Sequence, residues 1–181
     1  ILISCHASFY NDVRSELLQK ITRIAPKGLN KVFLSNSGAE SVECAIKLAR
    51  KFSGKPEIIA VMGAFHGKTM GALSATWNKK YREGFTPLVP DFRHVPPDDA
   101  EKVREAITEK TAAIIVEPIR GEGGIRVPPD DFLPRLREIC NEKRVLLILD
   151  EVQTGFGRTG KVFACEHWNV VPDILCLAKS L

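Results

Sequence analysis

Short, continuously apolar runs recur along the chain and alternate with segments of helical periodicity. A run that is apolar throughout and too short for an ordinary helix predicts a strand buried on both faces. Such runs occupy residues 57–62, 111–116, 145–149 and 174–177, and shorter strands are expected at residues 31–35 and 92–95.

Between these runs, apolar residues recur at the spacing of one helix face. Phe9, Val13 and Leu17, for example, share a face of a helix expected over residues 8–24. Further helices are expected at residues 42–52, in a small-residue segment ending at Ala75, and at residues 98–110 and 128–143. This alternation predicts an α/β fold, with a mostly parallel sheet flanked by helices and joined by right-handed connections.

The composition is that of a soluble globular protein, with 44% hydrophobic and 27% charged residues among 181. The net charge of +4 is modest and the basic residues are dispersed, which argues against a nucleic-acid or membrane surface. No apolar run is long enough to span a bilayer. Five widely spaced cysteines form no C-x-x-C pair and indicate reduced, buried thiols in a cytosolic protein, and no histidine stands at metal-ligand spacing from them.

Two charged residues follow buried strands. Asp150 comes directly after the run 145–149, and Lys179 follows the run 174–177. The carboxyl ends of parallel strands meet at one edge of a sheet, where ligands bind, so this acid and amine are expected to converge. A buried lysine tends to lose its proton and is then a nucleophile for Schiff-base chemistry. An acid facing a ring nitrogen is the other half of a pyridoxal phosphate site.

A plainer interpretation of these two residues is also open, in which Asp150 caps a turn and Lys179 extends into solvent. The Ser-Gly-Ala turn at residues 37–39 has two interpretations as well. It either presents backbone N–H groups to a phosphate at the start of a helix or is an ordinary N-cap. Phe65, at the exit of the strand 57–62, either lies against a planar ligand or is a core residue.

The segments Asp150-Glu-Val-Gln-Thr-Gly-Phe-Gly-Arg-Thr-Gly-Lys161, Phe163-Ala-Cys-Glu-His167 and 172–181 together resemble the signature of the class III, or ω-amino acid, aminotransferases. The resemblance extends from Phe9 to the last residue. It implies the large domain of a fold-type I enzyme that uses pyridoxal 5′-phosphate (PLP). It further implies that residues 1–181 are truncated at both ends and lack a C-terminal small domain.

The resemblance also implies residue roles. Lys179 would carry the cofactor as a Schiff base and Asp150 would pair with its ring nitrogen, which makes these two the expected catalytic residues. Val152 would pack on the ring, and Gln153 would bond the ring hydroxyl.

The remaining cofactor contacts implied are Ser37, Gly38 and Ala39 at the phosphate, Phe65 on the ring and His66 beside it. Glu117 and Glu122 would help form the substrate pocket. Arg120 stands between them where the family commonly has glutamine, which alters the local charge. Lys68 likewise replaces the more usual arginine.

The function implied is transfer of an amino group from an ω-amine or amino acid, such as acetylornithine, ornithine or 4-aminobutyrate, to 2-oxoglutarate. A cytoplasmic homodimer with shared active sites is expected. A PLP-dependent racemase or aminomutase on the same scaffold is an alternative, as is an inactive α/β interaction fragment. A dinucleotide-binding domain is disfavoured because no Gly-x-Gly-x-x-Gly follows a first strand.

Overall fold

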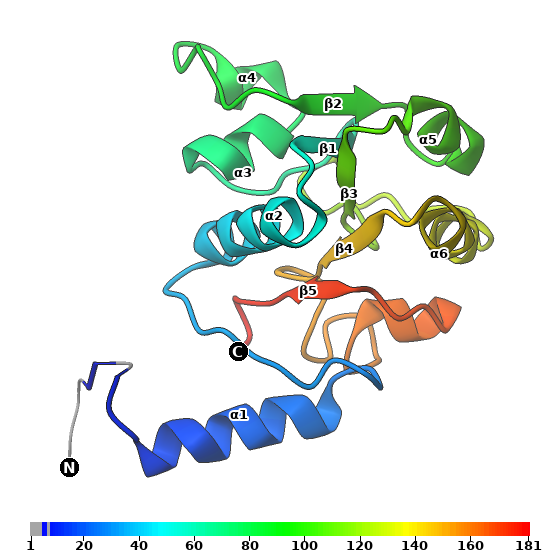
Figure 1. Ribbon diagram of the computed structural model, residues 1–181. Coiled ribbons are helices and arrows are strands. Elements are labelled where there is room, and N and C mark those ends of the chain that lie inside the picture. Colours follow the sequence, from blue (N-terminus) through cyan, green and yellow to red (C-terminus); the bar gives the residue numbers. More distant parts are fainter. Residues whose placement is uncertain (1–4, 7) are drawn as a thin grey trace. The chain divides into compact units, whose positions relative to one another are not determined.

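The computed structural model describes residues 5, 6 and 8–181 (Figure 1). They fall into two compact units divided between Leu34 and Ser35. The first unit contains one helix, α1 (Asp12–Ile24). It begins directly after Asn11, because the side chain of that residue caps it by accepting a hydrogen bond from the Arg14 backbone N–H at 2.8 Å.

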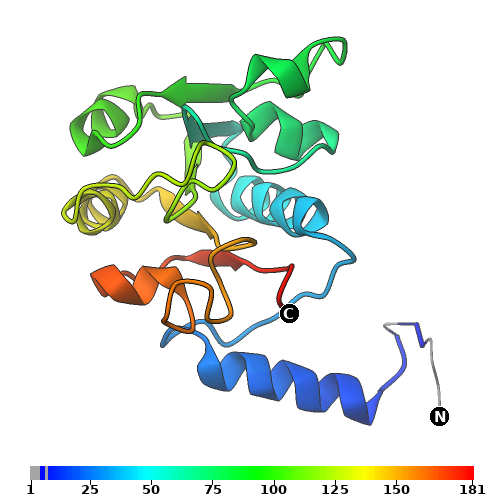
Figure 2. The same ribbon diagram turned by 180° about the vertical axis from the view of Figure 1, so that it is seen from behind.

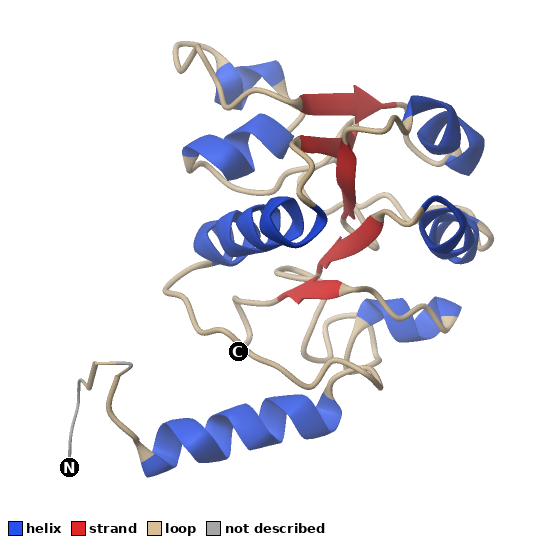
Figure 3. Ribbon diagram, viewed as in Figure 1, coloured by secondary structure: helices blue, strands red, loops and turns tan. Residues whose placement is uncertain are grey.

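The second unit is built on a five-stranded sheet (Figure 3). Its order is β2-β1-β3-β4-β5, and every neighbouring pair is parallel. The strands are β1 (Glu57–Val61), β2 (Phe92–Val95), β3 (Thr111–Val116), β4 (Leu146–Asp150) and β5 (Ile174–Cys176). β1 and β3 are buried throughout, as expected of strands covered on both faces.

Helices cover both faces of this sheet, as Figure 1 shows from one side and Figure 2 from behind. One face carries α2 (Gly38–Ser53), α3 (Met70–Ala75) and α4 (Lys79–Arg82). The other carries α5 (Ala100–Ala106), α6 (Phe132–Lys143) and the 3₁₀ helix η1 (Ala164–Trp168).

The core lies between the sheet and each helical layer. Alternate strand residues point to opposite faces, so Ile58 joins the core beneath α2 whereas Ile59 joins the core beneath α6. The predicted parallel α/β architecture is confirmed.

Most predicted elements are present, with shifted ends. The strand expected at residues 31–35 is wrong, because those residues pair with no strand in the described structure. Phe33 is 76% exposed, so the segment does not bury the apolar side chains that suggested a strand. The short helices α4 and η1 were not predicted. α2 begins four residues earlier than expected because Ser37 caps it.

Candidate active site

A cavity of about 430 Å³ opens where the strands of the second unit end. This volume is within the usual range for small-molecule and cofactor sites. Its walls come from segments that are far apart in the sequence and follow β1, β3, β4 and β5, together with the start of α2. The lining residues are Asn36, Ser37, Gly38, Ala39, Phe65, His66, Gly67, Lys68, Glu117, Asp150, Val152, Gln153, Ala178 and Lys179.

The first turn of α2 presents backbone donors to this cavity. The Ser37 side chain accepts from the Glu40 backbone N–H at 3.2 Å, which caps the helix. In the described part of the chain, the backbone N–H groups of Gly38 and Ala39 have no acceptor. The start of a helix with free N–H groups is suited to binding an anion.

Asp150 is buried at the end of β4 and held by two hydrogen-bonding contacts. Its Oδ2 lies 2.8 Å from Nδ1 of the fully buried His66 side chain, and its Oδ1 accepts from the Val152 backbone N–H at 3.1 Å. His66 is held in turn, because its backbone N–H donates to Oγ1 of Thr76 at 2.9 Å. The carboxylate therefore has one fixed orientation at the cavity wall.

Glu117 follows β3 and joins two loops. Its Oε1 accepts from the Phe65 backbone N–H at 2.8 Å, and its Oε2 accepts from the Gly121 backbone N–H at 3.0 Å. Burial raises the pKa of the Glu117 carboxyl above its usual value, whereas His66 and the two N–H donors oppose that rise. Glu117 therefore fixes the loop that carries Phe65 as well as lining the cavity.

Phe65 contacts an aromatic residue that the sequence did not single out. Its ring meets the ring of Tyr81 edge-on, with centroids 5.1 Å apart. The Lys68 Nζ lies 5.8 Å from the centroid of the same Tyr81 ring. Tyr81, on α4, therefore supports two residues of the cavity wall.

Two glycines make room for the side chains of Val152 and Gln153. A Cβ at Gly38 would lie 2.7 Å from Cγ1 of Val152, and a Cβ at Gly121 would lie 1.8 Å from Oε1 of Gln153. Real Cβ atoms do not approach other atoms so closely. Val152 and Gln153 therefore take their places only because positions 38 and 121 lack a side chain.

Glu151, next to the catalytic candidate Asp150, lies outside the cavity lining and is fully buried. Its carboxylate accepts from the backbone N–H of Ala164 at 2.6 Å and of Cys165 at 2.8 Å, and from Oγ1 of Thr154 at 3.0 Å. Its backbone N–H continues the ladder to β5 by donating to the Cys176 carbonyl at 2.9 Å.

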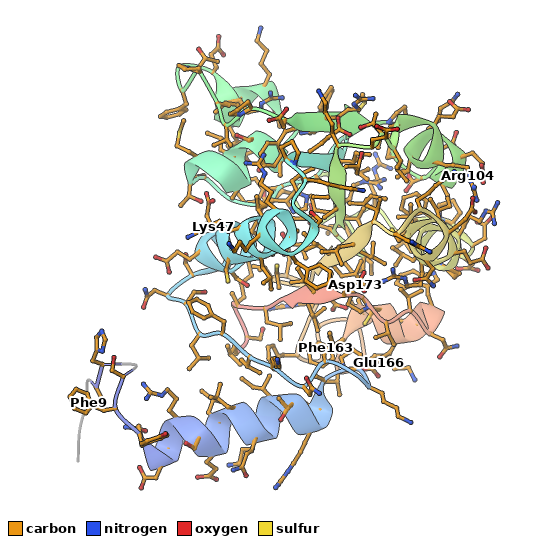
Figure 4. The ribbon with its side chains drawn as sticks, viewed as in Figure 1. Phe9, Lys47, Arg104, Phe163, Glu166 and Asp173 are labelled. Atoms are coloured by element: carbon orange, nitrogen blue, oxygen red, sulfur yellow. The ribbon has the colours of Figure 1, made fainter. Side chains whose placement is uncertain are left out.

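Glu151 thus anchors the start of η1, where the Phe163 backbone N–H also donates to Oε1 of Glu166 at 2.9 Å (Figure 4). This anchoring fixes the turn that carries Val152 and Gln153.

Lys179 lines the cavity but is not buried, so the interpretation that its burial would remove the proton is wrong. The side chain is exposed because β5 ends at Cys176 and the chain has left the sheet before Lys179. Its backbone has a left-handed φ of 47°. In the described structure the amine has no hydrogen-bond or ion-pair partner.

The two acidic residues predicted for the substrate pocket lie in different places. Glu117 lines the cavity, whereas Glu122 is exposed and lies outside the lining, so its place in a substrate pocket stays a prediction. Arg120 is buried and pairs with Asp98 through two hydrogen bonds of 2.8 and 2.7 Å. Its charge is therefore neutralised outside the cavity.

A family model described as Aminotransferase class-III matches residues 1–181. The chain belongs to the class III aminotransferases. It is 59% identical over 180 residues to an acetylornithine aminotransferase from Methanopyrus kandleri, covering 99% of this chain and 46% of that protein. It is 53% identical over 178 residues to a putrescine aminotransferase from Pectobacterium atrosepticum, covering 93% of this chain and 38% of that protein. The chain thus spans less than half the length of these relatives.

Solved structures of other aminotransferases share the fold. An ornithine aminotransferase structure from Toxoplasma gondii, with partial occupancy of PLP at its active site, superposes with a TM-score of 0.90 at 37% identity. The match covers 96% of this chain and 42% of that one. The second unit therefore has the sheet of the fold-type I aminotransferases, whose cofactor is PLP.

The cavity suits PLP in size and in chemistry. The free N–H groups at the start of α2 fit a phosphate, and the Asp150 carboxylate fits a protonated ring nitrogen. Nε2 of His66 is buried without a partner in the described structure and can form one more hydrogen bond. The residues present therefore fit the family's cofactor.

Several residues of the site were not predicted from the sequence. Gly67 and Ala178 line the cavity without a functional group that would have identified them, and nothing in the sequence singles out the Asn36 carboxamide. Thr76 and Tyr81 act through neighbours that are distant in sequence. In the described residues, no cluster of three or more His, Cys, Asp or Glu side chains is arranged to hold a metal ion, and no helix is long and apolar enough to cross a membrane.

Proposed function

We propose that this chain is the cofactor-binding portion of a PLP-dependent aminotransferase. The observation that carries the proposal is the convergence of an anion-binding helix start, a buried carboxylate and a free lysine amine on one cavity. Bound PLP supplies an electron sink for the carbon next to a substrate nitrogen. The protein's own groups hold it in place and move protons.

In this proposal Ser37, Gly38 and Ala39 bind the phosphate through the start of α2. Asp150, oriented by His66, accepts a hydrogen bond from the ring nitrogen and keeps that nitrogen protonated.

Phe65 and Val152 pack against the ring, and Gln153 donates to its hydroxyl oxygen. Lys179 binds the cofactor covalently through Nζ. When not bonded to the cofactor, Nζ would act as the base that takes a proton from the reacting carbon or returns one to it. Because the Lys179 side chain is exposed and lines the cavity, Nζ is accessible to both the cofactor and a substrate amine.

Glu117 and Glu122 contribute to the substrate pocket in the same proposal. The donor is an ω-amine or amino acid of the acetylornithine, ornithine, 4-aminobutyrate or putrescine kind, and the acceptor is 2-oxoglutarate. The names of the two relatives support transamination over racemisation or aminomutation. The proposal includes a cytoplasmic homodimer with shared active sites, in which residues 1–181 form most of the large domain.

Borohydride reduction tests this proposal. The complete protein is incubated with PLP, reduced, digested and analysed by peptide mass, with Lys179→Ala and the exposed loop variant Lys161→Ala in parallel. We expect the adduct on Lys179 in the wild type and in Lys161→Ala, and none in Lys179→Ala. An adduct that persists in Lys179→Ala, or none in the wild type, would overturn the proposal.

Donor choice is measured in the same preparation. Each candidate amine is added to the PLP-loaded protein, and loss of the visible absorbance band is followed. Recovery of the band on adding 2-oxoglutarate identifies the acceptor. A band that no amine bleaches would argue against an aminotransferase.

A further inference from the structure

The loop that follows β3 is held by a charged pair outside the cavity. The guanidinium of Arg120 donates from Nη1 to Oδ1 of Asp98 at 2.8 Å and from Nη2 to Oδ2 at 2.7 Å. Two parallel charge-assisted bonds fix direction as well as distance. The Arg120 side chain is only 8% exposed and that of Asp98 30%, so water screens this pair less than a surface ion pair.

Both partners of this pair sit in constrained backbone. Arg120 exchanges two backbone hydrogen bonds with Arg126, of 3.1 and 3.0 Å, which close the loop on itself. Asp98 has a left-handed φ of 63° and immediately precedes Asp99, the N-cap of α5. The pair therefore joins the loop after β3 to the start of a helix.

The same loop lies close against the turn after β1. A Cβ at Gly123 would lie 2.5 Å from the Gly63 carbonyl oxygen, and a Cβ at Gly63 would lie 3.7 Å from Nε of Arg120. The turn after β1 leads to Phe65 and His66. A shift of the loop would therefore reach the cavity wall.

The residue after Arg120 lies against Gln153, one of the residues that line the cavity. Gly121 lies so close to Gln153 that a Cβ there would overlap the Gln153 carboxamide, and its backbone N–H is held by Glu117. The position of Gly121 therefore determines where the Gln153 side chain can lie.

We propose that Asp98 and Arg120 are a positioning pair that holds Gly121 against Gln153 and so sets the place of the Gln153 carboxamide in the cavity. This inference rests on the proposed function, because Gln153 matters there as a cofactor contact. Arg120 acts through its neighbours, and its charge is not a site for a substrate anion.

The test compares Asp98→Asn, Arg120→Met and the double variant in the complete protein. Arg104→Met is the matched control, because Arg104 on α5 pairs with Glu142 at 2.8 Å, outside the cavity lining (Figure 4). Hydrogen exchange of the Arg120 and Arg126 amides is measured without cofactor. The PLP dissociation constant and the visible band of the bound cofactor are measured with it.

We expect each single variant to speed exchange of these two amides, to change the visible band and to weaken PLP binding about tenfold, the scale of one charge-assisted hydrogen bond. The double variant should be no worse than Arg120→Met, because the two residues act as a unit. Combining Arg120→Met with Gln153→Ala should likewise add little to Gln153→Ala. Arg104→Met should leave the hydrogen exchange of these amides, the visible band and the PLP affinity unchanged.

The inference would be overturned if the single variants kept the visible band and the PLP affinity of the wild type. Whether or not their melting temperature fell, the pair would then contribute at most to stability. Full additivity with Gln153→Ala would also overturn it. Failure of the wild type itself to bind PLP is a different result, which overturns the proposed function. The exchange measurement would then still report whether the pair holds the loop.

Discussion

Nδ1 of His66 lies 2.8 Å from Oδ2 of Asp150, and both side chains are buried although they are 84 residues apart in the chain. The contact gives the carboxylate one orientation. His66→Ala should weaken PLP binding by about tenfold or more, because a buried hydrogen bond to a charged group is lost. Titration of the visible band measures this. His167→Ala, in an exposed contact with Thr159, is the control and should bind normally. Equal affinity in both variants would contradict the role of His66.

Gly121→Ala should change the site with little effect on the fold. The new Cβ would meet the end of the flexible Gln153 side chain, which can swing away at low energetic cost. We expect PLP binding to weaken several-fold and the melting temperature to stay within a few degrees of wild type. In a Gln153→Ala background the same substitution should have almost no further effect on PLP binding. A large loss of thermal stability would show that the loop, and not the side chain, had moved.

Gly38→Ala should instead destabilise the protein. Here the new Cβ meets Cγ1 and Cγ2 of Val152 at 2.7 and 3.0 Å, and a β-branched side chain has few alternative rotamers. Overpacking of this kind costs about 1–3 kcal/mol, read as a lower urea midpoint of unfolding. Val152→Ala should restore most of the loss, and failure to do so would place the strain elsewhere.

Glu151→Ala should be among the most damaging single changes near the site. It leaves the buried N–H groups of Ala164 and Cys165 without acceptors, at a cost of about 1–3 kcal/mol each. Denaturant unfolding gives the free energy, and faster hydrogen exchange at these two amides locates the effect. Glu166→Ala, which removes an acceptor from the Phe163 N–H, is the partly exposed comparison and should cost less. Stability close to wild type in Glu151→Ala would contradict the anchoring role.

Glu117→Gln should alter how stability depends on pH. Burial raises the pKa of this carboxyl in the folded state, so the folded protein keeps its proton at a pH where the unfolded chain has lost it. The stabilising contribution is therefore complete below the unfolded pKa and is lost as pH rises through the raised folded value. The stability of the wild type relative to Glu117→Gln should thus fall as pH rises over that interval. Melting temperatures of both proteins across this range measure the difference, and a constant difference would contradict the shift.

The regular part of the fold could be predicted from the sequence because its signals are local. β3 was predicted with both ends correct, since Thr111 and five apolar residues lie between Lys110 and Glu117. Asp150 lies at the carboxyl end of β4, as expected from its position directly after the apolar run 145–149.

Features that depend on long-range contacts were not predicted. Lys179 is exposed because β5 ends early, at Cys176, and no residue in the run 174–177 indicates that end. The pairing of Arg120 with Asp98 joins two loops 22 residues apart, and nothing in either loop specifies the other. The strand expected at residues 31–35 had suitable residues but no strand beside it.

The candidate site is assembled from residues distributed along almost the whole of the second unit, and this has a consequence for biosynthesis. Ser37 and its helix leave the ribosome early, whereas Lys179 leaves last of all the residues that line the cavity. The turn proposed to bind the phosphate can therefore be complete while the amine is still inside the exit tunnel. If Lys179 carries the cofactor as proposed, covalent attachment would follow the synthesis of every other residue that lines the cavity.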